Sequence, residues 1–324
     1  MGSTPWTRRV GARTGETLLA AAIGLLAVGC RETRELPACV EPSPSQGPAL
    51  TPSGDPVVVG AGDIAEPQPV GAALTAALLD GIDGEVITLG DNAYVNATLD
   101  NFLGPYASTW GRHRWRTHPT LGNHEYHSPH AGPYFAYFCA AAGPAFKGWY
   151  SYDVGAWHFV VLNSQCASTD GYESGPGCDA GSEQAAWLRA DLAAHPARCT
   201  AAAWHHPRFS SGSHGDHLAM GDLWRQLAEA GAELVLSGHD HDYERFAPVD
   251  ADGRADPEHG MRQLVVGTGG ATLYKFGAAA HANSEVRIAD QWGVMKLTLH
   301  AESYDWEFLA VDGVVRDSGW TRCH

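Results

Sequence analysis

The chain of 324 residues carries 37 acidic and 21 basic side chains, a formal charge of -16, and 44% of its residues are hydrophobic. This composition is typical of a globular protein with a sizeable core and excludes an intrinsically disordered chain. Because an acidic surface repels a polyanion, we expect no nucleic acid among its partners.

The first thirty residues have the pattern of an export signal. Three arginines precede an apolar run over 17–28, which is too short to span a membrane comfortably and ends at Gly29-Cys30. This ending is similar to the lipobox of bacterial lipoproteins, in which the cysteine carries a lipid; an ordinary secretory signal cleaved nearby is the alternative. We predict a signal peptide over 1–30 and an exported protein, on the outer face of the membrane, in the periplasm or in the medium. A lipid on Cys30 would be its contact with the membrane.

Residues 31–55 are rich in proline and serine and have no apolar period, which predicts a tether. Apart from Cys30 the chain has six cysteines, and an even number in an oxidising compartment predicts disulfides. Cys166 and Cys178 flank a glycine-rich loop and are the predicted pair. The sequence leaves the pairing of the other four cysteines open.

Along the rest of the chain, several short apolar runs are followed by aspartate, asparagine or histidine, residue types that commonly bind metal ions. In most cases a glycine stands between the apolar run and the polar residue. Most of these runs have the length of a fully buried strand. They lie at 57–59, 86–89, 121, 201–204 and 234–236, and they lead to Asp63, Asp91, Asn123-His124, His205-His206 and His239-Asp240-His241. Helical patterns lie between several of them, at 70–79, 182–194 and 216–230, and further strands are predicted at 264–267, 293–299 and 303–311.

Strands that alternate with helices predict a layered α/β fold, in which ligands gather beyond the carboxyl ends of the strands. A single aspartate or histidine after a strand is usually a turn or cap residue. Five strand ends with the same layout are hard to explain by structure alone, so we expect these side chains to converge on one metal site.

The five blocks resemble those of the calcineurin-like metallophosphoesterases, in the same order. The blocks are Gly62-Asp63, Gly90-Asp91-Asn92-Ala93-Tyr94, Gly122-Asn123-His124-Glu125, His205 and Gly238-His239-Asp240-His241. Tyr94, three residues after the second aspartate, is similar to the tyrosine of the purple acid phosphatase branch. The resemblance implies one catalytic domain over 56–324, an α/β fold whose layered β-sandwich core is flanked by helices.

The resemblance also implies two metal ions that share Asp91. One ion would be bound by Asp63, Tyr94 and His241, a set of hard oxygens with one imidazole that suits Fe(III). The other would be bound by Asn123, His205 and His239, neutral donors that suit a divalent Zn, Fe or Mn. Three negative charges on the ligands against five positive charges on the ions leave room for a hydroxide and a phosphate oxygen, as in two-metal hydrolases.

Three further residues are implied on the substrate side. His124 would contact the phosphate or the leaving oxygen, and Glu125 would orient that imidazole or a neighbouring group. His214 lies nine residues after His205, and the resemblance implies that it binds phosphate and protonates the leaving alcohol. A solvated loop residue is the ordinary alternative for Glu125 and His214, and His206 and His217 are alternatives for the task of His214.

The function implied is an exported phosphatase that hydrolyses phosphate monoesters of small molecules, with broad specificity, by attack of a metal-bound hydroxide on phosphorus. A phosphodiesterase or nucleotidase could use the same two ions, although Tyr94 favours the monoester. A catalytically weak lipoprotein that binds metal or phosphate is the alternative of a different class. The intact set of seven ligands with His124 counts against it.

Overall fold

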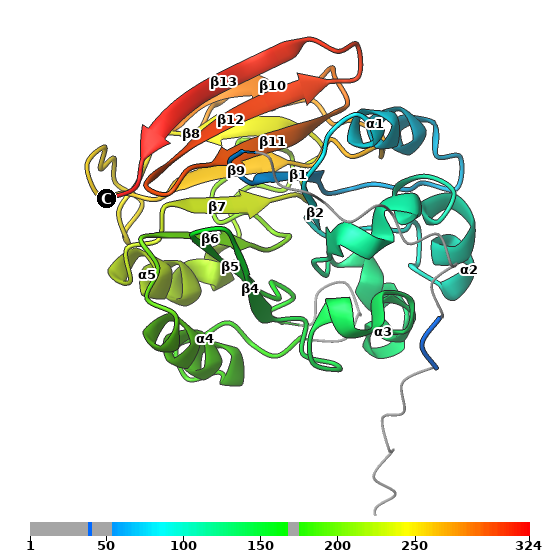
Figure 1. The fold of residues 1–324 in the computed structure, drawn as a ribbon, viewed down its shortest axis with the longest axis horizontal. Helices are drawn as coiled ribbons and strands as arrows, with labels where there is room; N and C mark the ends of the chain where they lie inside the picture. Colours follow the sequence, from blue (N-terminus) through cyan, green and yellow to red (C-terminus); the bar gives the residue numbers. More distant parts are fainter. Residues whose placement is uncertain (1–37, 41–53, 168–174) are drawn as a thin grey trace, which may run out of the picture. The chain divides into compact units, whose positions relative to one another are not determined.

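The computed structural model describes residues 38–40, 54–167 and 175–324, all within one compact unit (Figure 1). The predicted signal peptide and most of the predicted tether lie outside the described residues, as does the stretch 168–174 between Cys166 and Cys178. Among the residues that are described, no helix is both long enough and apolar enough to cross a membrane.

Two sheets form the centre of the domain. The first has the strand order β13-β12-β11-β1-β2-β3 and the second has the order β10-β8-β9-β7-β6-β5-β4. The first sheet contains β1 (Val57–Ala61), β2 (Glu85–Thr88), β3 (Thr117–His118), β11 (Gly293–Leu299), β12 (Ser303–Ala310) and β13 (Val315–Arg322). The second contains β4 (Tyr150–Val154), β5 (Trp157–Val161), β6 (Cys199–Ala203), β7 (Leu234–Ser237), β8 (Tyr243–Phe246), β9 (Arg262–Val266) and β10 (Ser284–Ile288). Strands β1, β2 and β3 are parallel to one another, and so are β5, β6, β7 and β9.

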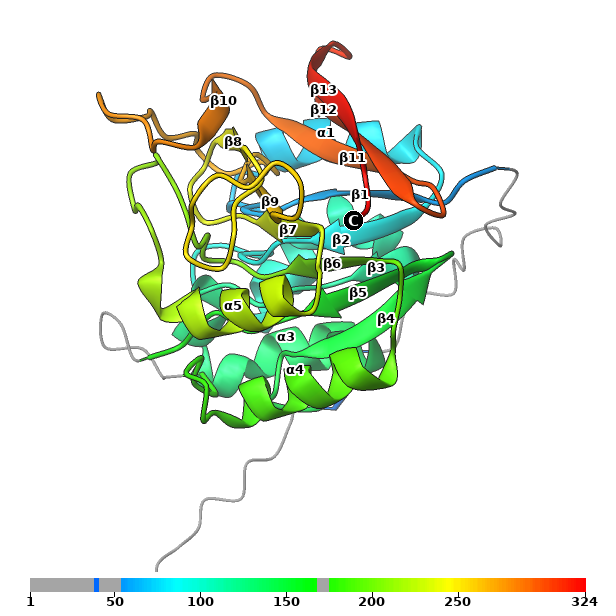
Figure 2. The same cartoon turned by 90° about the vertical axis from the view of Figure 1, so that its left-hand side faces the viewer.

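Helix α1 lies on the outer face of the first sheet, and α4 and α5 cover that of the second (Figure 2). The helices are α1 (Val70–Asp80), α2 (Leu99–Asn101), α3 (Gly132–Phe138), α4 (Glu183–Ala194) and α5 (Gly221–Glu229). Side chains that alternate along β7 enter two different cores: Leu234 and Leu236 join the cluster between the sheets, and Val235 joins the cluster beneath α4 and α5. This alternation follows from the two-residue period of a strand and confirms the predicted layers.

The predicted helices at 70–79 and 182–194 are confirmed, the latter with Ser182 as its cap, since its hydroxyl accepts a hydrogen bond from the Ala185 N–H at 3.1 Å. The prediction at 216–230 is wrong at its start. Helix α5 begins at Gly221, after a 3-10 helix over Leu218–Met220, and the Asp216 carboxylate accepts the Ser210 N–H at 2.9 Å within the preceding loop. Leu121 also lies in a loop, since the strand before it ends at His118.

Two disulfides are present in the described part of the chain. The predicted pair Cys166–Cys178 is confirmed. A second disulfide joins Cys199, at the start of β6, to Cys323, next to the last residue. It fastens the chain terminus to the second sheet.

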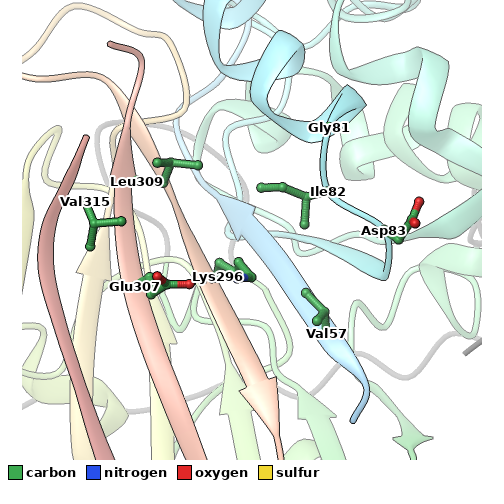
Figure 3. A pocket seen from close by; sticks show the side chains of 8 residues that line it. All are labelled: Val57, Gly81, Ile82, Asp83, Lys296, Glu307, Leu309 and Val315. Atoms are coloured by element: carbon green, nitrogen blue, oxygen red, sulfur yellow. Dashed lines mark hydrogen bonds and ion pairs between the residues drawn. The ribbon is translucent and has the colours of Figure 1, made fainter. Parts of the chain in front are cut away.

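A hollow of about 380 Å³ lies on the face of the first sheet that carries α1, beyond the end of that helix (Figure 3). Its lining residues are Val57, Gly81, Ile82, Asp83, Lys296, Glu307, Leu309 and Val315. Lys296 and Glu307 already pair with each other at 2.7 Å. None of the predicted site residues lines this hollow, so it is separate from the predicted metal site.

Candidate metal centre

The predicted ligands come from both sheets and meet at the carboxyl ends of parallel strands. Asp63 and Asp91 follow β1 and β2 of the first sheet. His205 follows β6 of the second sheet, and the pair His239 and His241 follows β7. Strands of both sheets therefore contribute to one group of oxygen and nitrogen donors, although these residues are far apart in the sequence.

The first group of donors surrounds the hydroxyl of Tyr94. This oxygen lies 2.9 Å from Asp63 Oδ1 and 3.2 Å from Asp91 Oδ2. His241 Nε2 lies 3.0 Å from the same hydroxyl and 3.3 Å from Asp63 Oδ1. All four side chains are buried. Metal–donor bonds of about 2.0–2.2 Å place neighbouring donors roughly 3 Å apart, so this spacing fits one bound cation.

The second group surrounds Nε2 of His205. This nitrogen lies 3.0 Å from Asn123 Oδ1 and 3.2 Å from His239 Nδ1. It also lies 3.3 Å from Asp91 Oδ2, the same oxygen that faces Tyr94. The two groups therefore meet at one carboxylate, and the donor set fits two cations that share it.

Backbone carbonyls orient two of the imidazoles. Nδ1 of His205 lies 2.8 Å from the Leu89 carbonyl oxygen, and Nδ1 of His241 lies 2.7 Å from that of Thr272. Each bond assigns the proton to Nδ1 and leaves Nε2 free to face the centre as a donor to metal.

The charges of these groups favour a cation. Burial and the neighbouring Asp63 raise the pKa of the Tyr94 phenol well above its usual value, so the phenol keeps its proton until a cation binds. Against the effect of burial, Asp91 raises the pKa of His205 to about 9.

Three of the predicted ligands lie in the left-handed region of backbone space, which residues with side chains rarely adopt: Asp63 (φ 59°), Asp91 (φ 49°) and His239 (φ 72°). Backbone strain of this kind gathers at functional sites. The neighbouring glycines are explained by close approach. A Cβ on Gly122 would lie 2.1 Å from Asp91 Oδ1, and one on Gly90 would lie 2.5 Å from His205 Nδ1.

His124 lies beside the centre, and Glu125 lies behind it. His124 Nε2 is 3.8 Å from Asp91 Oδ2, its Nδ1 is 2.5 Å from the Val95 carbonyl oxygen, and its ring packs 4.4 Å from that of Tyr94. Glu125 is fully buried and accepts the N–H groups of Asp91, Asn92 and Gly122 at 3.1, 2.8 and 2.6 Å. Its carboxylate therefore positions the backbone that carries Asp91. Of the two roles expected for Glu125, the contacts are those of a residue that orients a neighbouring group and not the His124 imidazole. Burial and Asp91 raise the pKa of Glu125 to about 7.

Of the three histidines considered for the leaving group, His214 has the exposed position. Its ring lies 4.3 Å from that of His239, and its side chain is 42% exposed. His206 is buried, with Nδ1 2.8 Å from the Ser164 hydroxyl and its ring stacked 4.7 Å from that of His217. His206 and His217 thus pack against each other, whereas His214 can reach a molecule in solution.

Sequence reasoning missed two residues at this site. Asp240 is fully buried, and its Oδ1 accepts both the N–H and the Nδ1 of His214 at 2.9 Å. Its place between two predicted ligands was the signal that could have identified it. Tyr274 stacks on the His241 ring at 4.0 Å with an interplanar angle of 8°. It lies in a loop, and no sequence pattern marked it.

Comparisons with known proteins identify the family. The family model for calcineurin-like phosphoesterases matches residues 57–243, more than half of the chain. The chain therefore belongs to the calcineurin-like phosphoesterase family. This membership implies metal ions at the site.

Individual relatives cover smaller parts of the chain. An uncharacterized protein of Mycobacterium tuberculosis (strain H37Rv) is 30% identical over 47% of this chain and 35% of its own length. Purple acid phosphatase 15 of Arabidopsis thaliana is 31% identical over 42% of this chain and 24% of its own length. Purple acid phosphatase 22 of the same plant is 34% identical over 38% of this chain and 27% of its own length. The matched region thus spans about a third or less of these relatives.

Solved structures share the fold. The purple acid phosphatase PPD1 of yellow lupin superposes with a TM-score of 0.69 at 22% identity, over 84% of this chain and 54% of that one. GAP50 of Plasmodium, described as the anchor in the inner membrane complex, superposes with a TM-score of 0.65 at 14% identity, over 84% and 90%. At these identities the likeness establishes the fold alone.

Proposed function

We propose that the chain is a phosphatase that uses two metal ions to hydrolyse phosphate monoesters of small molecules. The observation that carries the proposal is the position of Asp91 Oδ2, which lies 3.2 Å from the Tyr94 hydroxyl and 3.3 Å from His205 Nε2. A carboxylate between two groups of donors suits a pair of ions that act on one phosphoryl group.

The two groups of donors differ in chemistry. Asp63, Tyr94 and His241 with Asp91 offer anionic oxygens, which suit Fe(III). Asn123, His205 and His239 offer neutral donors, which suit Zn or divalent Fe or Mn. When bound, the ions would activate water for attack on phosphorus and neutralise the charge that develops on the phosphoryl oxygens.

The histidines of the chain would act on the substrate. His124, held through Nδ1 by the Val95 carbonyl, presents Nε2 on the side of Asp91 and would bind a phosphoryl oxygen. His214, held through Nδ1 by Asp240, presents Nε2 away from that carboxylate and would give its proton to the leaving oxygen. Glu125 and Asp240 would act through the groups they position.

A comparison of two substrates tests the proposal. Purified, metal-loaded protein is assayed on para-nitrophenyl phosphate and on its bis-ester from pH 4 to pH 9. We expect a strong preference for the monoester. Preference for the diester would make the protein a phosphodiesterase with the same metal centre. Activity on neither, with metals bound, would favour a metal- or phosphate-binding protein.

We further propose that the protein is exported and carries a lipid on Cys30. The two disulfides support this compartment, because such bonds persist in oxidising surroundings. Labelling of cells with a radioactive fatty acid tests the anchor. We expect label in the wild-type chain and none in Cys30→Ala, and label in neither would leave an ordinary secretory signal.

A further inference from the structure

Two cysteines of the domain, Cys39 and Cys139, are outside the two disulfides. They are about 100 residues apart in sequence. Cys39 belongs to the short described segment 38–40, drawn in blue in Figure 1. Cys139 directly follows the last residue of α3.

The segment 38–40 is docked at the end of α3, next to Cys139. The Val40 N–H donates to the Ala136 carbonyl oxygen at 2.9 Å. The Arg114 guanidinium donates to the Val40 carbonyl oxygen at 2.8 Å. Both backbone polar groups of Val40 are therefore hydrogen-bonded to the domain, and the residue before it, Cys39, is held close by.

The thiol of Cys139 lies among the same groups. Its Sγ is 3.2 Å from the Ala136 carbonyl oxygen that accepts the Val40 N–H. It is also 3.6 Å from Arg114 Nη2 and 3.9 Å from the Val40 carbonyl oxygen. A disulfide needs Cα atoms about 4.4–6.8 Å apart. These contacts place the Cys139 thiol beside the residue that directly follows Cys39.

We propose that Cys39 and Cys139 form a third disulfide that fastens the segment before the domain to the end of α3. In this oxidation each thiol loses a proton and the pair gives up two electrons as the S–S bond forms. The oxidant is a disulfide, carried by a thiol–disulfide oxidoreductase or by oxidised glutathione, and it is reduced to two thiols.

The third disulfide would shorten the tether. With a lipid on Cys30, the free chain between anchor and domain would be the nine residues to Cys39, with a reach of about 30 Å. Without the disulfide, and with the hydrogen bonds of Val40 broken, it would be the 26 residues to Pro56, with a reach of about 90 Å. The disulfide would thus hold the domain close to the membrane surface.

Peptide mapping tests the proposal, because trypsin places each cysteine of interest in its own peptide. The full chain, exported by its host, is alkylated in acidic denaturant and digested without reductant. We expect peptides 35–112 and 117–147 joined by a bond that a reductant breaks. Alkylation of both peptides would overturn the proposal, as would a link from 35–112 to any other peptide.

A variant supplies the matched control. In Cys139→Ser the Cys39 peptide should become fully alkylated. The Cys166–Cys178 bond, inside peptide 148–189, and the bond between peptides 199–208 and 323–324 should stay intact. Cys39 that remains protected in this variant would show another partner and contradict the pairing.

Discussion

At the scale of single residues, we assign His124 to the substrate and not to the metals. Its Nε2 stands 3.8 Å from Asp91, outside the contacts of about 3 Å that the donor atoms make with one another. We predict that His124→Ala keeps the metal content and lowers kcat by about a hundredfold or more, the usual effect of losing such a group. Metal analysis beside steady-state kinetics measures both.

A neighbouring histidine gives the control. His127 Nδ1 lies 3.0 Å from the same Val95 carbonyl oxygen, and its ring is 4.4 Å from that of His124. His127→Ala should change kcat less than about tenfold, because the role proposed belongs to the imidazole that faces Asp91. Equal losses in both variants would mean that the histidine pair is structural.

Asp240 is predicted to act through His214. Its Oδ1 holds both the backbone and the ring of that residue, and its Oδ2 accepts the Ser210 hydroxyl at 2.5 Å. We predict that Asp240→Asn lowers kcat by about tenfold, since the imidazole loses its anionic partner. The double variant with His214→Ala should then be no slower than His214→Ala alone, because coupled residues are not additive. Independent, additive losses would contradict this assignment.

At the scale of elements, loops carry the site and buried polar groups hold the loops. Glu125 connects the loop after β2 to the loop after β3 by accepting backbone N–H groups from both. We predict that Glu125→Gln destabilises the fold by about 2 kcal/mol, because a single amide oxygen leaves buried donors unsatisfied. Urea denaturation measures the change.

The exposed Glu183 gives the matched comparison, since it pairs with Lys147 on the surface. Glu183→Gln should change the free energy of unfolding by less than about 1 kcal/mol. An equal loss of unfolding free energy in both variants would show that the buried contacts of Glu125 stabilise the fold no more than a surface ion pair does.

Several of the donors could be predicted because they follow buried strands whose apolar pattern is visible in the sequence, as Asp63, Asp91 and His205 do. Asn123 follows only the two-residue strand β3, and its motif rather than an apolar strand marked it. The contacts of Asp240 and Glu125 could not, since they depend on how loops from different strands meet. The start of the helical pattern at 216–230 was misplaced for a related reason, since the Asp216 carboxylate binds the Ser210 N–H across its own loop. Counting cysteines predicted disulfides, but not the pairing of Cys199 with Cys323, because an even number fixes no connectivity.

At the scale of the whole molecule, disulfides that close loops of different length should contribute differently to the free energy of unfolding. The Cys199–Cys323 bond closes a sequence separation of 124 residues, and the Cys166–Cys178 bond closes one of 12. Loop-closure entropy predicts that the double variant Cys199→Ser, Cys323→Ser loses about 5 kcal/mol of unfolding free energy. The double variant Cys166→Ser, Cys178→Ser should lose about 3 kcal/mol. Denaturation curves of the two double variants give the order, and the reverse order would contradict the entropic explanation.

The metal content of the purified wild-type chain, measured by elemental analysis after growth with iron, zinc and manganese, shows directly whether two ions share the Asp91 carboxylate. We predict two ions per chain, at least one of them iron, and near-complete loss of both in Asp91→Ala. One ion or none in the wild-type chain, or two ions retained in Asp91→Ala, would contradict this prediction.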